Sequence, residues 1–126
     1  MLSWSNVEKA KYIRGFADGE GGPRFYKRKG IKEGHLKSGQ SLIRGISISN
    51  SDFYLLNTVG LMLTDFGIKS HIYLDVKKGD KKATMNAWIL RILDKESIKK
   101  FTEIIGFSNP VKQDILYQIL ASYRKV

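Results

Sequence analysis

The stretch Tyr12-Ile13-Arg14-Gly15-Phe16-Ala17-Asp18-Gly19-Glu20-Gly21-Gly22 decides the fold of this chain. It begins as an amphipathic helix, yet it places Gly15 and Gly19 one turn apart, although each interior glycine costs a helix roughly 1 kcal/mol relative to alanine. Two glycines at this spacing leave a stripe without side chains, which is useful where another backbone must come very close. Glu20 follows just past the predicted helix end, between glycines, where a carboxylate held by a turn is suited to bind a metal ion.

The composition points to a polyanionic partner. The 126 residues include 22 Lys and Arg against 12 Asp and Glu, which gives a net charge of +10, and such an excess favours nucleic acid or an acidic membrane. The basic residues are not gathered on one helix and no stretch approaches the length of a membrane span, so we expect no membrane partner. The absence of cysteine excludes a disulfide framework and a thiolate zinc site. The N-terminus lacks the features of a signal peptide, so we expect an intracellular protein, in the cytoplasm or an organelle.

The patterning predicts a single domain over residues 1–126 in which helices alternate with pairs of strands. A capping box, Ser5 with Glu8, starts a first helix that ends near Gly19. Alternating apolar residues predict strands over 24–28, 42–49, 71–77 and 83–93. Three further helices are predicted from capping residues and helix-ending glycines, over 52–67, 94–106 and from 109 onward.

This order defines the expected fold class. Two hairpins in a four-stranded antiparallel sheet, with helices packed on one face, make an α+β domain with the order αββαββα. Glycine and charged residues between the paired strands, over 29–41 and 78–82, predict two basic hairpin connections.

Residues 13–21 resemble the LAGLIDADG motif of homing endonucleases. Both glycines and both acidic positions of the motif are present, while the first apolar position is Ile13 and the second acid is Glu20 in place of Asp. The family has the αββαββα order, so the resemblance covers nearly the whole chain. It implies a site-specific double-strand DNA endonuclease, encoded in an intron, that hydrolyses phosphodiester bonds with Mg²⁺, or with Mn²⁺ in its place, and leaves 3′ overhangs.

One motif in a short chain implies a homodimer. The predicted interface comprises Ile13, Gly15, Phe16, Asp18 and Gly19. A two-fold axis between the motif helices makes the DNA site a near-palindrome of roughly 20 base pairs. Two other functions are possible on the same fold: an intron RNA maturase and a DNA-binding regulator that does not cleave. The presence of Glu20 argues against loss of the catalytic acid in this chain. A dimeric domain without catalysis is a third reading, and the net charge disfavours it.

The resemblance also implies the residues of the cleavage site. Glu20 is the expected metal ligand, with the carbonyl of Gly19. Asn50, at the end of the second predicted strand, would position water, with Ser51 as the alternative, although Asn50 could equally be a helix cap. Lys112 would polarise water or stabilise charge, unless it is a solvated lysine of the first helical turn, and Arg91 is a further candidate.

The other sheet face is expected to lie in the DNA major groove. Alternation predicts these contacts: Arg24, Tyr26 and Arg28; Ser47 and Ser49, with Arg44 if a bulge shifts the strand; His71, Tyr73, Asp75 and Lys77. Arg91 of the fourth predicted strand is a further expected DNA contact. Lysines in or beside the hairpin connections would contact phosphate: Lys27, Lys29, Lys32, Lys37, Lys78, Lys81 and Lys82. Because Pro23 cannot donate a hydrogen bond, the first strand should start late or lie kinked, which could change the face of Arg24 and Tyr26.

Overall fold

A computed structural model describes residues 4–27, 42–76 and 86–123. The elements follow the predicted order: α1 (Asn6–Glu20), β1 (Gly21–Lys27), β2 (Leu42–Asn50), α2 (Phe53–Asp65), β3 (His71–Val76), β4 (Ala87–Ile92), α3 (Lys95–Lys100), the π-helix η2 (Phe101–Ile105) and α4 (Pro110–Ser122). The predicted α+β class is confirmed. No helix in the described ranges has both the length and the apolar character that a membrane span requires.

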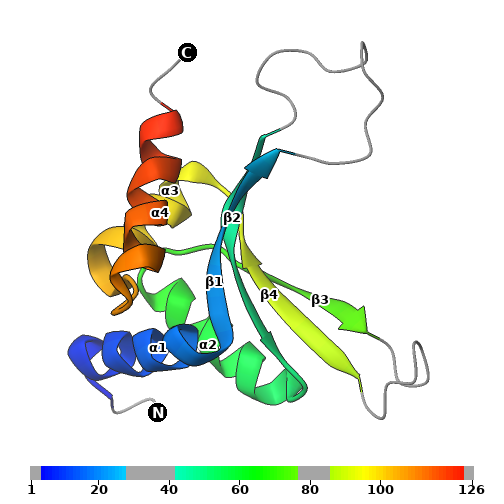
Figure 1. Ribbon diagram of the computed structural model, residues 1–126. Coiled ribbons are helices and arrows are strands. Elements are labelled where there is room, and N and C mark those ends of the chain that lie inside the picture. The colour runs from blue at the N-terminus through cyan, green and yellow to red at the C-terminus, as the bar shows by residue number, and fades with distance from the viewer. Residues whose placement is uncertain (1–3, 28–41, 77–85, 124–126) are drawn as a thin grey trace.

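The four strands form one antiparallel sheet with helices on one side only. The strand order is β1-β2-β4-β3, so β2 and β4 lie in the centre and β1 and β3 form the edges. Figure 1 shows the sheet curving around an open concave side, while α1, α2, α3 and α4 all pack against the opposite side. The sheet therefore has a helix face and a face on which no described helix packs.

The core lies between the helix face and the helices. Alternate residues of the two central strands are fully buried in it, namely Ile46, Ile48, Leu90 and Ile92. They pack against buried residues of the helices: Ile13, Ala17, Leu56, Val59, Leu63, Ile98, Phe101, Leu116 and Ile119. Each such aliphatic side chain contributes about 1.5–3 kcal/mol by leaving water, so this face provides most of the driving force for folding.

Side-chain caps define where the helices begin. Ser5 and Glu8 form the predicted capping box of α1. The Asp52, Asp94 and Asn109 side chains accept hydrogen bonds from the first turns of α2, α3 and α4. The last helical segment before α4 ends at Gly106, whose φ of 66° lies in the region that favours glycine.

Two predicted boundaries near the motif are wrong. Helix α1 continues through Glu20, so Glu20 is its last residue and does not lie beyond it. Strand β1 begins directly at Gly21 and contains Pro23, with an unbroken register from Gly21 opposite Ile48 to Lys27 opposite Leu42. Proline fits here because β1 is an edge strand with one neighbour, so a missing N–H can face away from the sheet.

Candidate nucleic-acid interface and cleavage site

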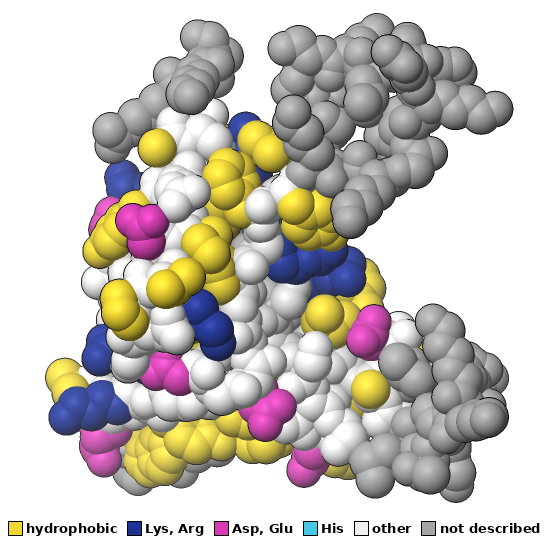
Figure 2. Space-filling view, viewed as in Figure 1, with side chains coloured by type: hydrophobic (Ala, Val, Ile, Leu, Met, Phe, Trp, Pro, Cys, Tyr) yellow, Lys and Arg dark blue, Asp and Glu magenta, His cyan; other side chains and the backbone are white. Residues whose placement is uncertain are grey.

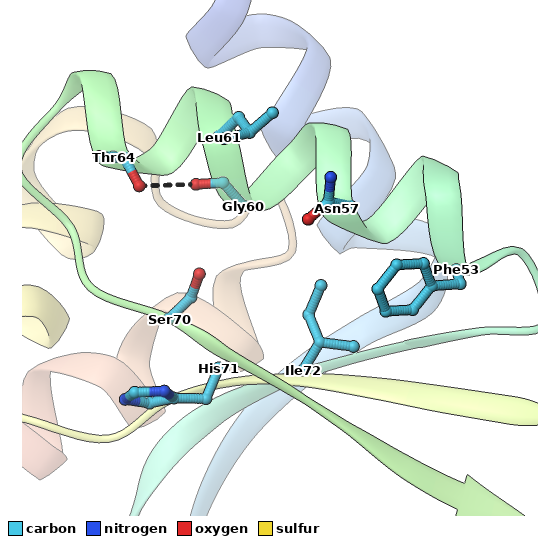
Figure 3. A pocket seen from close by; sticks show the side chains of 8 residues that line it. All are labelled: Phe53, Asn57, Gly60, Leu61, Thr64, Ser70, His71 and Ile72. Carbon is cyan, nitrogen blue, oxygen red and sulfur yellow. Dashed lines mark hydrogen bonds between the residues drawn. The ribbon is translucent and has the colours of Figure 1, made fainter.

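The sheet surface opposite the helices, here called the open face, is built by strand alternation. Ile46, Ile48, Leu90 and Ile92 point to the core, so the residues between them point the other way. The strand registers then place the following residues on the open face: Gly22, Arg24 and Tyr26 of β1; Ile43, Gly45, Ser47 and Ser49 of β2; His71 and Tyr73 of β3; Ile89 and Arg91 of β4. Figure 3 shows the same alternation on β3, where Ile72 points toward α2 and His71 points away from it.

Arg44 lies on the helix face, which corrects its placement on the open face. Its Nε donates a hydrogen bond of 2.7 Å to the Ser122 hydroxyl, and its guanidinium stacks over the Tyr123 ring at 4.3 Å. The register of β1 with β2 contains no bulge, so the shift on which that placement depended does not occur. Burial raises the pKa of Tyr123, while the charge of Arg44 opposes this rise.

A bulge interrupts β3 at Asp75. The register passes from Leu74 opposite Trp88 to Val76 opposite Ala87, which leaves Asp75 as the extra residue. On β3, strand alternation therefore assigns residues to the open face only as far as Tyr73. Arg28 and Lys77, two other predicted DNA contacts, lie outside the described residues, as do the six predicted phosphate-contacting lysines from Lys29 to Lys82.

The positive charge is concentrated in the strand connections and not in the described body of the protein. The whole chain has 22 basic and 12 acidic residues. The described ranges hold 12 of the basic and 10 of the acidic residues. The remaining ten basic and two acidic residues fall mainly in segments 28–41 and 77–85, which join β1 to β2 and β3 to β4. Segments 28–41 and 77–85 thus carry +6 of the net charge of +10.

The glycine stripe of α1 is uncovered. Gly15 and Gly19 are exposed, and a Cβ atom added to either would meet no neighbouring atom within 4 Å. Beside the stripe, the rings of Trp4, Tyr12 and Phe16 form a row with centroid separations of 5.4 and 6.4 Å. Hydrophobic side chains gather along this lower edge of the molecule in Figure 2.

The prediction that Ile13 lies in a dimer interface is wrong. Ile13 is fully buried in the core, and helical geometry places it on the side of α1 opposite Gly15. Phe16 is half-buried and stacks on Tyr12. Asp18 is also half-buried, and its carboxylate accepts a hydrogen bond of 2.8 Å from the backbone N–H of Ser108.

Lys112 forms hydrogen bonds with the end of the motif helix α1, to residues that precede and follow Glu20. Its ammonium donates hydrogen bonds to the carbonyl of Asp18 at 3.1 Å and to the carbonyl of Gly21 at 2.7 Å. The last carbonyls of a helix have no partner within it, and a cation is favoured at that end. Lys112 is therefore not a solvated lysine of the first turn of α4, but part of the structure that surrounds Glu20.

Two further contacts hold the end of η2 and the segment that follows it against α1. Arg14 Nε donates to the carbonyl of Ile105 at 2.8 Å, and Asp18 accepts from Ser108. These residues place the start of α4, and with it Lys112, beside the motif. No sequence signal identifies Arg14 or Ser108 for this role, because the contacts join positions 90 or 91 residues apart.

Asn50 lies at the same end of the sheet as Glu20. It is the last residue of β2, two positions beyond Ile48, which pairs with Gly21. Its side-chain carbonyl accepts a hydrogen bond of 2.8 Å from the N–H of Asp52. Asp52 is the cap of α2, so Asn50 is not the helix cap, and Ser51 is exposed in the turn between them.

A divalent cation fits the chemistry of this end of α1. Glu20 is exposed, and the end of α1 also carries backbone carbonyls. Mg²⁺ is commonly bound by one or two carboxylates together with substrate phosphates and water. The described residues contain no cluster of three or more His, Cys, Asp or Glu that would hold a metal without such additional ligands.

Comparison with known proteins places the chain in a family. A LAGLIDADG-like domain matches residues 8–106, and the chain belongs to this family. The fold resembles that of I-CeuI, a group I intron-encoded homing endonuclease solved in complex with DNA, with a TM-score of 0.61 and 16% identity over 93% of this chain. It also resembles the homing endonuclease I-CvuI, solved with the I-CreI target uncleaved in 2 mM Mg, with a TM-score of 0.61 and 13% identity over 95% of this chain.

The similarities to solved structures show the fold, and the domain match shows the family. The chain spans 56% of the I-CeuI chain and 68% of the I-CvuI chain. No curated protein matches the sequence. The protein thus has the fold of homing endonucleases, a family whose solved members include complexes with DNA.

Proposed function

We propose that the protein is a homodimeric, Mg²⁺-dependent endonuclease that cleaves both strands of a specific DNA site and leaves 3′ overhangs. The observation that carries the proposal is the double hydrogen bond of Lys112 around Glu20. These bonds hold a cation at the carbonyls of Asp18 and Gly21, which flank Glu20, the exposed acid of the family motif. Such a protein acts where its DNA is, in the cytoplasm or in an organelle.

The uncovered glycine stripe supports the homodimer. Gly15 and Gly19 have open space where side chains would be, and another backbone can approach closely only at such a surface. A second copy packed there about a two-fold axis brings the two Glu20 residues together near the axis. The DNA site is then a near-palindrome with two equivalent half-sites, roughly 20 base pairs in total.

The residues around Glu20 have separate roles in this proposal. Glu20 and the carbonyl of Gly19 would hold Mg²⁺, which supplies Lewis-acid polarisation of the phosphate and a more acidic bound water; Mn²⁺ is expected to substitute. Asn50 would orient water by hydrogen bonding. Lys112 has three N–H donors and uses two for backbone carbonyls. The third would stabilise negative charge on the phosphate or on the leaving oxygen.

The open face and the hairpin connections would bind the DNA. Arginine and tyrosine side chains of the sheet are suited to base edges in the major groove, while the lysine-rich connections are suited to phosphate. The nearly balanced charge of the described body and the basic connections support this division.

Cleavage of a randomised near-palindromic DNA library tests the proposal. The purified protein is incubated with the library and Mg²⁺, and the cleaved ends are sequenced to obtain the site and the overhang. We expect one near-palindrome to be cleaved, and Glu20→Gln to lower the rate by roughly a thousandfold or more. Glu103→Gln removes an equally exposed acid from η2 and should cleave normally.

Full cleavage by Glu20→Gln would contradict the assigned site. Tight binding of DNA without cleavage in either Mg²⁺ or Mn²⁺ would exclude the nuclease and leave the DNA-binding regulator or the maturase. Structured intron RNA would then be the next substrate to test.

A further inference from the structure

One row of residues crosses the open face over all four strands. The registers place Gly22 of β1 opposite Ser47 of β2, Ser47 opposite Arg91 of β4, and Arg91 opposite His71 of β3. The row begins two residues after Glu20, so it crosses the sheet near the motif end of β1.

Two adjacent members of this row carry buried polar atoms without partners. The Ser47 hydroxyl oxygen and Arg91 Nε are both inaccessible to solvent and form no hydrogen bond with any described residue. Native proteins rarely leave such atoms unpaired, because a buried polar atom without a hydrogen bond loses its interactions with water and gains nothing in return. Two of them side by side indicate that the fold does not use the polar groups of this row for its own hydrogen bonding.

Arg91 differs from the other three arginines of the described ranges. Arg14 donates to the carbonyl of Ile105, Arg24 to the Tyr26 hydroxyl and Arg44 to the Ser122 hydroxyl. Within the same ranges, Arg91 forms no hydrogen bond and no ion pair. Its guanidinium carbon lies 5.7 Å from the centroid of the Tyr73 ring. Stacking on a ring restrains the guanidinium plane and leaves its terminal nitrogens free.

The surface around Arg91 is open enough for a base edge. A Cβ atom on Gly22 would meet no neighbouring atom within 4 Å, so the β1 end of the row has no side chain above the sheet. On the other side, Arg24 and Arg91 both line a hollow of about 640 Å³. Figure 2 shows basic side chains in the hollow on the open side of the molecule.

We propose that Arg91, restrained by Tyr73 and backed by Ser47, is the residue that reads a guanine in the inner part of each half-site. This inference rests on the proposed function. A guanidinium with two free terminal nitrogens matches the O6 and N7 acceptors that guanine presents in the major groove. The row starts beside Glu20, so the guanine lies closer to the cut than the bases that Arg24 contacts. Two-fold symmetry repeats the contact in both half-sites.

Selection of bound DNA without cleavage tests the assignment. The Glu20→Gln protein, with and without Arg91→Ala, selects duplexes from the randomised near-palindromic library, and the bound fraction is sequenced. Arg91→Ala should reduce the preference for guanine at one inner position per half-site by roughly ten- to a hundredfold, with the other positions unchanged. Arg24→Ala is the matched control from the same hollow, and it should change a different position, farther from the centre.

Arg91→Met separates loss of recognition from loss of folding. Methionine keeps much of the apolar stem and removes the unpaired Nε, so the melting temperature should stay the same or rise while the guanine preference is lost. A uniform loss of affinity, with unchanged base preferences and a salt dependence lower by about one phosphate contact, would overturn the inference and make Arg91 a phosphate ligand. Unchanged preferences and affinity would also overturn it, while the dimeric nuclease would stand. If the Glu20→Gln parent selects no sequence, both proposals fail.

Discussion

The two faces of the sheet use the same strands in opposite ways. On the helix face, the central residues Ile46 and Leu90 are fully buried, and the polar Arg44 has a hydrogen bond and a stacked ring. On the open face, the neighbouring positions carry Ser47 and Arg91, whose buried polar atoms have no partner among the described residues. Adjacent residues of one strand therefore have different roles: one face stabilises the fold, and the other carries polar groups that the fold does not use for its own hydrogen bonds.

The largest expected difference between the faces is in core packing. Leu90→Ala removes a fully buried side chain from β4 and should lower the free energy of unfolding by about 2–5 kcal/mol. Ile89→Ala changes the adjacent residue on the open face, which is half-buried, and should cost about 1 kcal/mol or less. Urea denaturation of both variants measures the difference. Equal losses would mean that the two faces contribute alike to stability.

Arg44 and Arg91 lie on opposite faces of the sheet, so substitution of each one compares the contribution of the two faces to stability. Arg44→Met breaks the hydrogen bond to Ser122 and the stacking on Tyr123, and should destabilise the protein by about 1–2 kcal/mol. Arg91→Met removes a buried nitrogen that has no partner in the described structure, so its unfolding free energy should stay within about 0.5 kcal/mol of the wild type or increase. Thermal denaturation in the absence of DNA makes the comparison. A larger loss for Arg91→Met would show that Arg91 serves the fold.

An effect no larger than that at Arg44 is expected at Asp94, where β4 leads into α3 on the helix side. Burial raises the pKa of Asp94, but the hydrogen bonds from Ser97, a backbone hydrogen bond of Asp94 itself and the charge of Lys69 together lower the pKa below 3.8. A carboxylate whose pKa is lower in the folded state stabilises the fold above its unfolded pKa, and loses that effect as the pH falls through the folded value. Asp94→Ala should therefore cost about 0.5–2 kcal/mol at pH 7.

The pH dependence of this difference is the test. Denaturation across a pH series should show the gap between the wild type and Asp94→Ala narrowing as the pH falls below 3.8. Asp94→Asn is the matched control, because asparagine caps helices about as well and does not titrate. A gap of constant size at all pH values would rule out the ionised cap as its cause.

The element order follows from local patterns. The capping box at Ser5 and Glu8, the asparagine cap with proline at Asn109 and Pro110, and the alternation in β2 and β4 all act over a few residues. Local interactions of this kind can be read from spacing alone. The prediction at Pro23 was wrong because the tolerance of a strand for proline depends on its position in the sheet, and the position of β1 at the edge is a property of the whole fold.

The candidate site also combines a motif that is local in sequence with contacts between distant residues. The motif residues Gly15, Gly19 and Glu20 lie within six positions of one another, so their pattern identifies the family and predicts the acid. The contact of Lys112 with Asp18 and Gly21 joins residues 94 and 91 positions apart, and its geometry follows from the packing of α4 and η2 on α1. The sequence also predicts the wrong side of the sheet for Arg44 and the wrong side of α1 for Ile13, because the elements that pack on each side are known only from the fold.

The sequence by itself determined the αββαββα order, the motif helix and the excess of positive charge, because periodicity, capping and composition are local or additive. Three features came only from the folded structure: Lys112 bonds to the carbonyls of Asp18 and Gly21, β1 begins at Gly21, and Arg91 lies opposite Ser47 on the open face with a buried unpaired atom on each. These features depend on strand register and helix packing, which bring together residues that have no relation along the chain. The physical reason is that hydrogen bonding and burial depend on distance in space, and sequence spacing sets that distance only within a single element.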